Sequence, residues 1–221
     1  LQLSGAWGRE RHLKTRPLVQ GLQQIESKRG ASSHYQNPFI ALCRPNSDED
    51  KGEVYAANLV YSGNFKASVE VNHYDRTRLS LGINEFDFSW LLKAGEEFQT
   101  PEAVLAYSDQ GLNKMSQLYH KFYRERLVKS KYKDEARPVL LNNWEGTYFD
   151  FDEDEILEIA ANASELGVEL FVLDDGWFGR RNNDTSSLGD WYVNINKLPN
   201  GVNGLAEKIN ELGLDFGIWV E

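Results

Sequence analysis

The carboxyl-terminal third of the chain alternates short apolar runs with longer helical patterns, and this order limits the possible folds most strongly. The apolar runs lie at residues 139–141, 170–173 and 216–220. They do not alternate with polar residues, which is typical of strands that are buried on both faces. Strand, helix, strand, helix, strand in this order predicts a parallel sheet with helices packed against it.

Both helices in this region carry start or stop signals. Asp152 is followed three residues later by Glu155, a capping box that predicts the start of a helix. Gly167 ends that helical pattern, and Gly213 ends the next one. The apolar stripes predicted to be buried on the two helices are Ile156, Ile159, Ala160, Ala163 and Leu166, and Leu205, Ile209 and Leu212.

The first half of the chain has a different pattern, with short runs of β-branched and aromatic residues broken by turn signals. Residues 54–61 and 65–71 flank the turn signal Ser-Gly-Asn, which predicts a hairpin. No catalytic motif is found in this half. We therefore expect an all-β sandwich at residues 1–100, with no part in the chemistry.

Between the two halves, apolar residues after Pro101 fall at helical spacings and predict a connecting helix. They are Ala103, Leu105, Ala106, Leu112, Met115, Leu118, Tyr119 and Phe122. A basic stretch at residues 124–133 follows and predicts a solvated linker. The sequence thus predicts a β domain at 1–100, a connecting helix and linker at 101–137, and an α/β domain at 138–221.

Composition excludes several classes of partner. The 221 residues carry 24 Lys and Arg against 34 Asp and Glu, a net charge of −10 that argues against binding nucleic acid. No apolar run reaches the roughly 18 residues that cross a bilayer, so no membrane partner is expected. The single cysteine, Cys43, favours a reducing compartment. The four histidines lack metal-ligand spacing, so no metal site is predicted.

Polar and aromatic residues follow each predicted parallel strand, where function gathers in such folds. They are Asn142, Asn143, Trp144 and Glu145 at the end of the first strand, Asp174 and Asp175 at the end of the second, and Trp219 and Glu221 at the end of the third. The loop at residues 176–203 is long, as are many loops that form a lid or binding wall, and it carries Trp177 and Trp191.

Carboxylates beside tryptophans are a combination that suits sugars. Carboxylates accept hydrogen bonds from neighbouring hydroxyls, and an indole face packs against the C–H face of a pyranose. The alternatives stay open here, because Asp174 and Asp175 could cap a helix or form a turn, and each tryptophan could fill the core. Adjacent strand residues point to opposite faces, so the pair is poorly placed to straddle one scissile bond. We interpret the two aspartates as substrate ligands.

Several longer motifs resemble bacterial α-galactosidases of glycoside hydrolase family 36. The resemblance covers nearly the whole chain, and its motifs at residues 141–150 and 173–179 are specific. Further matching runs lie at residues 188–191, 197–199 and 216–221, and in the β half at 29–34 and 37–39.

This resemblance implies a retaining α-galactosidase that removes terminal galactose from oligosaccharides such as melibiose and raffinose. The family fold is an all-β supersandwich, a (β/α)8 TIM barrel and a carboxyl-terminal β domain, of which this chain would hold the end of the supersandwich and the first βα units. By the same resemblance, Asp174 and Asp175 hydrogen-bond the 4- and 6-hydroxyls of galactose. Trp144 and Trp219 line the sugar pocket, and Trp177 and Trp191 are further candidates.

The resemblance also implies where the remaining parts lie. The nucleophile in a Lys-Trp-Asp motif and the acid/base aspartate are absent from these 221 residues, so both catalytic carboxylates are expected after Glu221. Because the chain lacks an initiator Met, we expect that both ends are cuts and that a signal peptide could be missing. The family implies no cofactor, a homotetramer and residence in the bacterial cytoplasm, although secreted relatives exist.

Two other functions remain compatible with the sequence. One is a non-catalytic sugar-binding protein in which the short barrel portion is the natural end. The other is a galactosyl transferase of the raffinose-synthase type, which shares the same chemistry.

Overall fold

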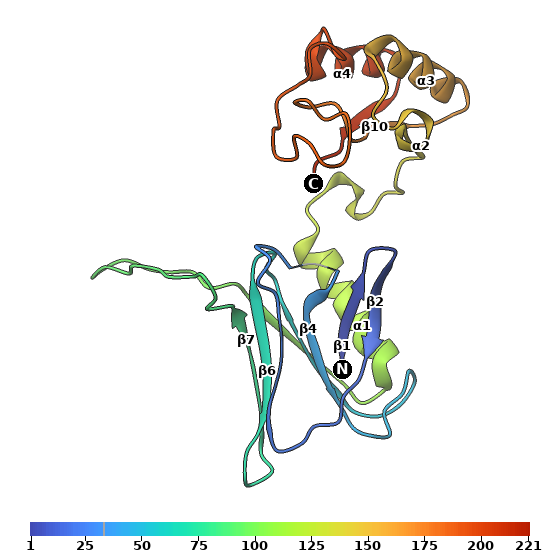
Figure 1. Cartoon of the computed structure of the whole chain (residues 1–221). Coiled ribbons are helices and arrows are strands. Elements are labelled where there is room, and N and C mark those ends of the chain that lie inside the picture. The colour runs from blue at the N-terminus through green and yellow to red at the C-terminus, as the bar shows by residue number, and fades with distance from the viewer. Residues whose placement is uncertain (33) are drawn as a thin grey trace. The chain divides into compact units, whose positions relative to one another are not determined.

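A computed structural model describes residues 1–32 and 34–221 of the chain (Figure 1). The chain forms two compact units, Leu1–Lys129 and Ser130–Glu221. Ser33, which belongs to the matching run at residues 29–34, lies outside the described residues. The division into three segments predicted from the sequence stays a prediction.

The first unit contains two antiparallel sheets. One has the strand order β2-β1-β4-β5-β8, and the other has the order β3-β6-β7. The strands are β1 Gln2–Ala6, β2 Arg9–Lys14, β3 Gly21–Glu26, β4 Gln36–Cys43, β5 Val54–Leu59, β6 Phe65–Val71, β7 Thr77–Ile83 and β8 Ala103–Ser108.

Apolar side chains from both sheets meet in one core, which makes the unit a sandwich. Ala57 and Leu59 of β5 pack with Phe65 and Ala67 of β6, and all four are buried. The other face of the larger sheet packs against helix α1 (Gly111–Phe122). There the Tyr119 hydroxyl donates to the Val104 carbonyl at 3.0 Å, and burial raises the pKa of this tyrosine.

The hairpin predicted around residues 62–64 is wrong, because its two strands belong to different sheets. Strand β5 pairs with β4 and β8, while β6 pairs with β3 and β7. The apolar faces of β5 and β6 pack against each other across the sandwich instead of lying side by side. The runs of β-branched and aromatic residues predicted both strands correctly, but they hold no information on whether the turn joins neighbouring strands or crosses between sheets.

The helix predicted from Ala103 is also wrong over its first part. Residues 103–108 form strand β8, which pairs with β5 along its whole length, and the helix starts only at Gly111. Leu105 and Tyr107 point away from the core, since they are 74% and 48% exposed. The apolar residues of this segment are compatible with the spacing of a helix and with that of a strand, and pairing with β5 decides which of the two forms.

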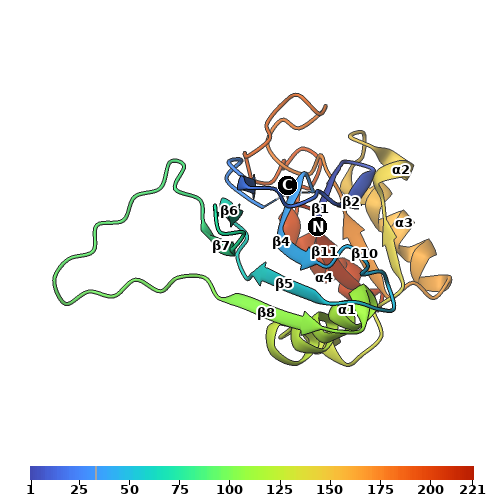
Figure 2. The same cartoon turned by 90° about the horizontal axis from the view of Figure 1, so that it is seen from below.

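Between β7 and β8 the chain has no helix or strand and extends away from the sheets, in both views of the structure (Figures 1 and 2). Its apolar side chains are exposed at Trp90 and Leu91. Within this segment, the ring centroids of Trp90 and Phe98 lie 4.9 Å apart.

The second unit is built on a parallel sheet with the strand order β11-β10-β9. Its elements are β9 Leu140–Asn142, α2 Trp144–Thr147, α3 Glu153–Glu165, β10 Leu170–Leu173, α4 Gly201–Glu211 and β11 Asp215–Ile218, after a short 3-10 turn at Lys131–Lys133. The predicted order of strands and helices is confirmed. A sandwich followed by the first βα units of a barrel is the fold class that the sequence predicted.

Helix α3 follows its sequence signals closely. The Asp152 carboxylate accepts the backbone N–H of Glu155 at 3.0 Å, and Gly167 adopts φ +83° just after the helix end. Ile156 and Ala160 are fully buried in the core beneath the sheet. Leu166, predicted in the same buried stripe, is 84% exposed because the helix has already ended there.

None of the helices in the described part of the chain is long and apolar enough to cross a membrane.

Candidate functional site

The three parallel strands bring the predicted polar residues to one edge of the sheet. In the strand register, Val172 pairs with Asn142, and Leu173 pairs with Ile218. The strand ends stay bonded beyond the sheet, since the Trp219 N–H donates to the Leu173 carbonyl at 2.8 Å. Asn142, Asp174 and Trp219 are therefore neighbours across this edge, as the sequence predicted.

Asp174 is half-buried and is held by groups from two strands. The Asn142 amide donates to Asp174 Oδ2, and the backbone N–H of Asp175 donates to Oδ1 at 2.7 Å. The backbone N–H of Asp174 donates to the side chain of Asn143 at 2.8 Å. Asn143 is itself buried and donates to Thr147 Oγ1 at 2.8 Å. The Asp174 carboxylate thus has a fixed orientation and remains partly accessible.

Asp175 has different surroundings, because it is buried in an ion pair with Arg181. Arg181 Nε lies 3.0 and 3.1 Å from the two carboxylate oxygens, and Nη2 lies 2.8 Å from Oδ2. The Arg181 side chain is 4% exposed, and the Asp175 side chain is 9% exposed. The hydrogen bonds to Asp175 raise the pKa of Arg181, although burial acts in the opposite direction.

The loop after β10 turns sharply at Gly176, which has φ +96°. A Cβ atom at this position would lie 3.3 Å from ring atoms of both Phe149 and Phe151. Lys197 fixes the other end of the loop by donating to the carbonyls of Phe149 and Gly176. Burial lowers the pKa of Lys197.

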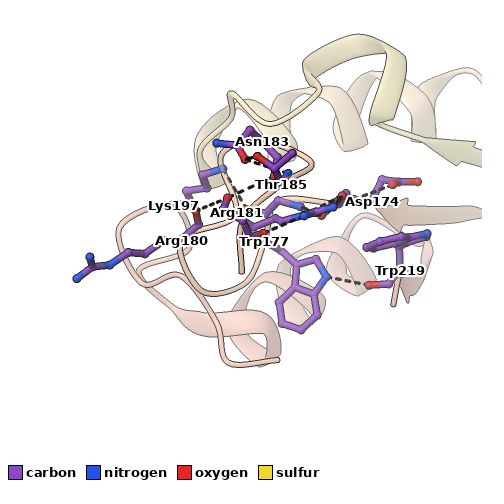
Figure 3. A network of polar contacts seen from close by, with 11 residues as sticks. Asp174, Trp177, Arg180, Arg181, Asn183, Thr185, Lys197 and Trp219 are labelled. Atoms are coloured by element: carbon purple, nitrogen blue, oxygen red, sulfur yellow. Dashed lines mark hydrogen bonds and ion pairs between the residues drawn. The ribbon is translucent and has the colours of Figure 1, made fainter. Parts of the chain in front are cut away.

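The tryptophans occupy different positions around this edge. Trp177 is 6% exposed and belongs to the core of the unit, and its indole N–H donates to the Trp219 carbonyl at 2.9 Å (Figure 3). Trp177 therefore fills the core and holds the end of β11, whereas Trp219 is half-buried. Trp191 is 40% exposed, and its ring lies 6.4 Å from the Trp219 ring.

Trp144 lies at the start of the short helix α2, after β9. Its ring makes edge contacts with Tyr148 and Phe149 at centroid distances of 5.2 and 4.9 Å. Its backbone N–H donates to Asn142 Oδ1 at 2.8 Å. This edge therefore carries a half-buried aromatic side chain, held to Asn142 through its backbone, as well as the Asp174 carboxylate.

The sequence reasoning missed Arg181 and Lys197 as members of this network. Neither stands next to a strand end, and a basic residue in a long loop is more often a solvated surface group. No sequence signal singles out Arg181, because its contact with Asp175 forms only when the loop between them is folded. Among the residues that the structure describes, no cluster of three or more histidine, cysteine or acidic side chains could hold a metal ion.

The parallel βα units and the carboxylate-rich strand ends define the beginning of a barrel of the glycoside hydrolase type. Residues 97–221 match the melibiase family, and residues 1–93 match the glycosyl hydrolase family 36 N-terminal domain. The chain belongs to glycoside hydrolase family 36.

Known relatives match over the whole chain but are much longer. The α-galactosidase AgaA of Geobacillus stearothermophilus is 62% identical and Mel36A of Lactobacillus acidophilus is 50% identical, each over 100% of this chain and 30% of the relative. The crystal structure of the α-galactosidase AgaB from G. stearothermophilus matches with a TM-score of 0.90 at 62% identity, and the chain covers 30% of it. An AgaA variant solved in complex with stachyose also matches, with a TM-score of 0.90 at 62% identity over all of this chain and 31% of that one. The chain thus spans about a third of the length of these relatives.

Proposed function

We propose that the full-length protein is a retaining α-galactosidase that removes terminal α-linked galactose from oligosaccharides such as melibiose and raffinose. The observation that carries this proposal is the edge at the carboxyl ends of the strands: the half-buried Asp174 accepts from Asn142, to which the Trp144 backbone N–H also donates, and Trp219 is hydrogen-bonded to the residue before Asp174. The relatives named α-galactosidases align with this chain over its whole length, at 62% and 50% identity. Two of the matching crystal structures contain raffinose or stachyose.

In this proposal the strand-end edge binds the galactosyl group and does not cleave the bond. Asp174 and Asp175 accept hydrogen bonds from the 4- and 6-hydroxyls. Trp144 and Trp219 pack against the apolar face of the sugar, with Trp191 as a further wall. Because the 4-hydroxyl is axial in galactose and equatorial in glucose, glucose would leave a carboxylate acceptor unpaired, which disfavours it strongly.

The chemical step requires groups beyond this chain. A retaining glycosidase needs two carboxyl groups about 5 Å apart across the scissile bond, one as nucleophile and one as acid/base. We place both after Glu221, on later strands of the barrel. The strand-end edge would then orient the anomeric carbon toward the nucleophile. A homotetramer and residence in the bacterial cytoplasm are further parts of this proposal, the latter resting on the single cysteine, Cys43.

Hydrolysis of an aryl α-galactoside by the full-length protein tests the proposal, with the aryl α-glucoside as control. We expect hydrolysis of the galactoside with a strong preference over the glucoside. Binding of galactose without hydrolysis would favour the non-catalytic sugar-binding protein. Galactosylated product formed in the presence of a sugar acceptor, in place of free galactose, would favour the transferase.

A further inference from the structure

The buried ion pair of Asp175 and Arg181 is not explained by stability alone. Removing two charges from water costs free energy, and the attraction between them repays that cost only when the geometry is good. A well-packed apolar pair of similar volume is often as stable or more stable. A fully paired charge cluster directly beside a half-buried carboxylate therefore suggests a role in recognition.

The donors around the two aspartates leave them with different capacities to bind a ligand. A carboxylate offers about four acceptor positions. Asp175 already receives the Gly176 N–H at 2.7 Å and two N–H groups of Arg181, which leaves about one position free. Asp174 receives two donors, from Asn142 and Asp175, which leaves about two. The pair can accept several hydroxyl groups without losing its internal contacts.

Arg181 connects this pair to the loops on either side. Its guanidinium carbon lies 5.6 Å from the ring centre of Phe149, in the loop after α2, and 5.9 Å from that of Phe178, in the loop after β10. Its Nη1 donates to the Ser186 carbonyl at 2.8 Å. All three nitrogen atoms of the guanidinium are therefore engaged, and Figure 3 shows the side chain enclosed by this network.

We propose that Arg181 is a positioning residue for galactose recognition. Its guanidinium fixes the Asp175 carboxylate and offsets the repulsion between the neighbouring carboxylates. The Asp175 backbone N–H in turn fixes Asp174, so the orientation of both sugar-binding groups depends on Arg181. This inference rests on the proposed function, because it assigns to Arg181 a role in the same binding site.

The neighbouring arginine provides a matched control. Arg180 lies on the same loop, is exposed, and points away from the network in Figure 3. In the full-length protein, we expect Arg181→Met to lower kcat/KM for an aryl α-galactoside about 100-fold, the effect of a misplacement of roughly 1 Å. We expect Arg180→Met to leave kcat/KM unchanged.

Competitive inhibition by galactose separates positioning from stability. Partial unfolding lowers kcat, because less enzyme is active, but does not alter the inhibition constant of the folded fraction. We expect Arg181→Met to raise the inhibition constant for galactose at least about tenfold, the loss of one charge-assisted hydrogen bond. Arg181→Lys keeps the charge but not the bidentate geometry, so it should raise this constant less.

Chemical rescue identifies the partner of Arg181. Ethylguanidinium added to Arg181→Ala should restore part of the lost kcat/KM and lower the galactose inhibition constant. The same addition should have no effect on Arg181→Ala combined with Asp175→Asn, because the carboxylate that binds the guanidinium is gone.

The outcomes separate the two proposals. Galactose inhibition constants equal to the wild-type value in both Arg181→Met and Arg181→Lys would overturn the positioning role and leave the α-galactosidase proposal intact. So would equal rescue of the single and double variants. A wild-type protein that neither hydrolyses the galactoside nor binds galactose would overturn both.

Discussion

The two units of the chain differ in where they place their charged groups. In the sandwich unit, ion pairs such as Arg78–Glu70 and Arg44–Glu53 lie on the surface, with each partner at least 40% exposed. The barrel unit also has an exposed pair, but it buries the Asp175–Arg181 pair and the Glu153 carboxylate. Exposed pairs contribute little to stability, whereas buried charges fix the geometry around them at a cost.

This difference indicates that the sandwich unit is a scaffold and that the barrel unit carries the candidate site. The sandwich is held mainly by apolar packing between its sheets and against α1. In the barrel unit, buried charges hold the strand ends and the long loop around a half-buried carboxylate, Asp174. The comparison implies that substitutions of charged residues affect activity and stability strongly in the barrel unit and weakly in the sandwich. Four predictions test this, from the largest expected effect to the smallest.

Asp174→Ala in the full-length protein should lower kcat/KM for α-galactosides by about 10³- to 10⁴-fold, because the site loses an acceptor for a sugar hydroxyl. The thermal midpoint should change little, since the side chain is half-buried and water can replace it. Steady-state kinetics and thermal melting of the same preparation provide both values. A large fall in thermal midpoint with normal specific activity would remove Asp174 from the site.

Glu153→Ala should destabilise the barrel unit by about 3 kcal/mol, because a buried carboxylate loses the charge-assisted hydrogen bonds that it accepts from Lys208 and Asn200. Glu153 is 3% exposed and accepts from Lys208 at 2.6 Å and from the Asn200 amide at 2.8 Å. Chemical denaturation measures the change. Glu70→Ala, which breaks the exposed pair with Arg78, is the matched control and should not shift the denaturation midpoint.

Asn84→Ala should destabilise the sandwich by about 2 kcal/mol, because it removes a buried amide that donates hydrogen bonds to two backbone carbonyls. The Asn84 amide donates to the carbonyls of Ser27 and Phe65 at 3.2 and 3.3 Å. Below the melting temperature, kcat/KM should stay at the wild-type value if this unit is only a scaffold. A loss of kcat/KM in the folded variant would contradict the separation of scaffold and site.

The smallest effect concerns pH. Burial raises the pKa of Glu153, but the hydrogen bonds from Lys208 and Asn200 outweigh it and leave this pKa below its usual 4.5. A carboxyl whose pKa is lowered by folding adds stability above its unfolded pKa and loses that contribution as the pH falls through its folded pKa. The stability difference between wild type and Glu153→Gln should therefore shrink as the pH falls below about 5, toward the lowered pKa of Glu153 in the folded protein. A pH-independent difference, measured by urea denaturation, would contradict this.

Sequence patterns predicted the barrel unit well because its signals are local. Buried strands without alternation, the Asp152 cap and the glycine at 167 each act over a few residues, and the structure places β10 at the predicted residues 170–173. In a parallel sheet these strands also fix where the site lies, so Asp174 and Trp219 could be placed together in advance.

The errors arose where distant contacts decide the structure. The turn at residues 62–64 crosses between sheets and does not close a hairpin, and residues 103–108 become a strand through pairing with β5. Arg181 was missed for the same reason, because its partner Asp175 is recognisable only when the loop is folded. The packing of Trp177 into the core of the barrel unit likewise depends on residues distant in the sequence, among them Trp219, whose carbonyl accepts its indole N–H.

Recognition of the galactose hydroxyls by the strand-end carboxylates is the core of the proposed function. Its most direct test compares wild type and Asp174→Asn in the full-length protein on an aryl α-galactoside and on its 4-deoxy and 6-deoxy forms. We predict that wild type loses at least about 100-fold in kcat/KM on the 4-deoxy or the 6-deoxy substrate, and that Asp174→Asn loses most of this penalty. Equal penalties in wild type and Asp174→Asn on both deoxy substrates would contradict the claim.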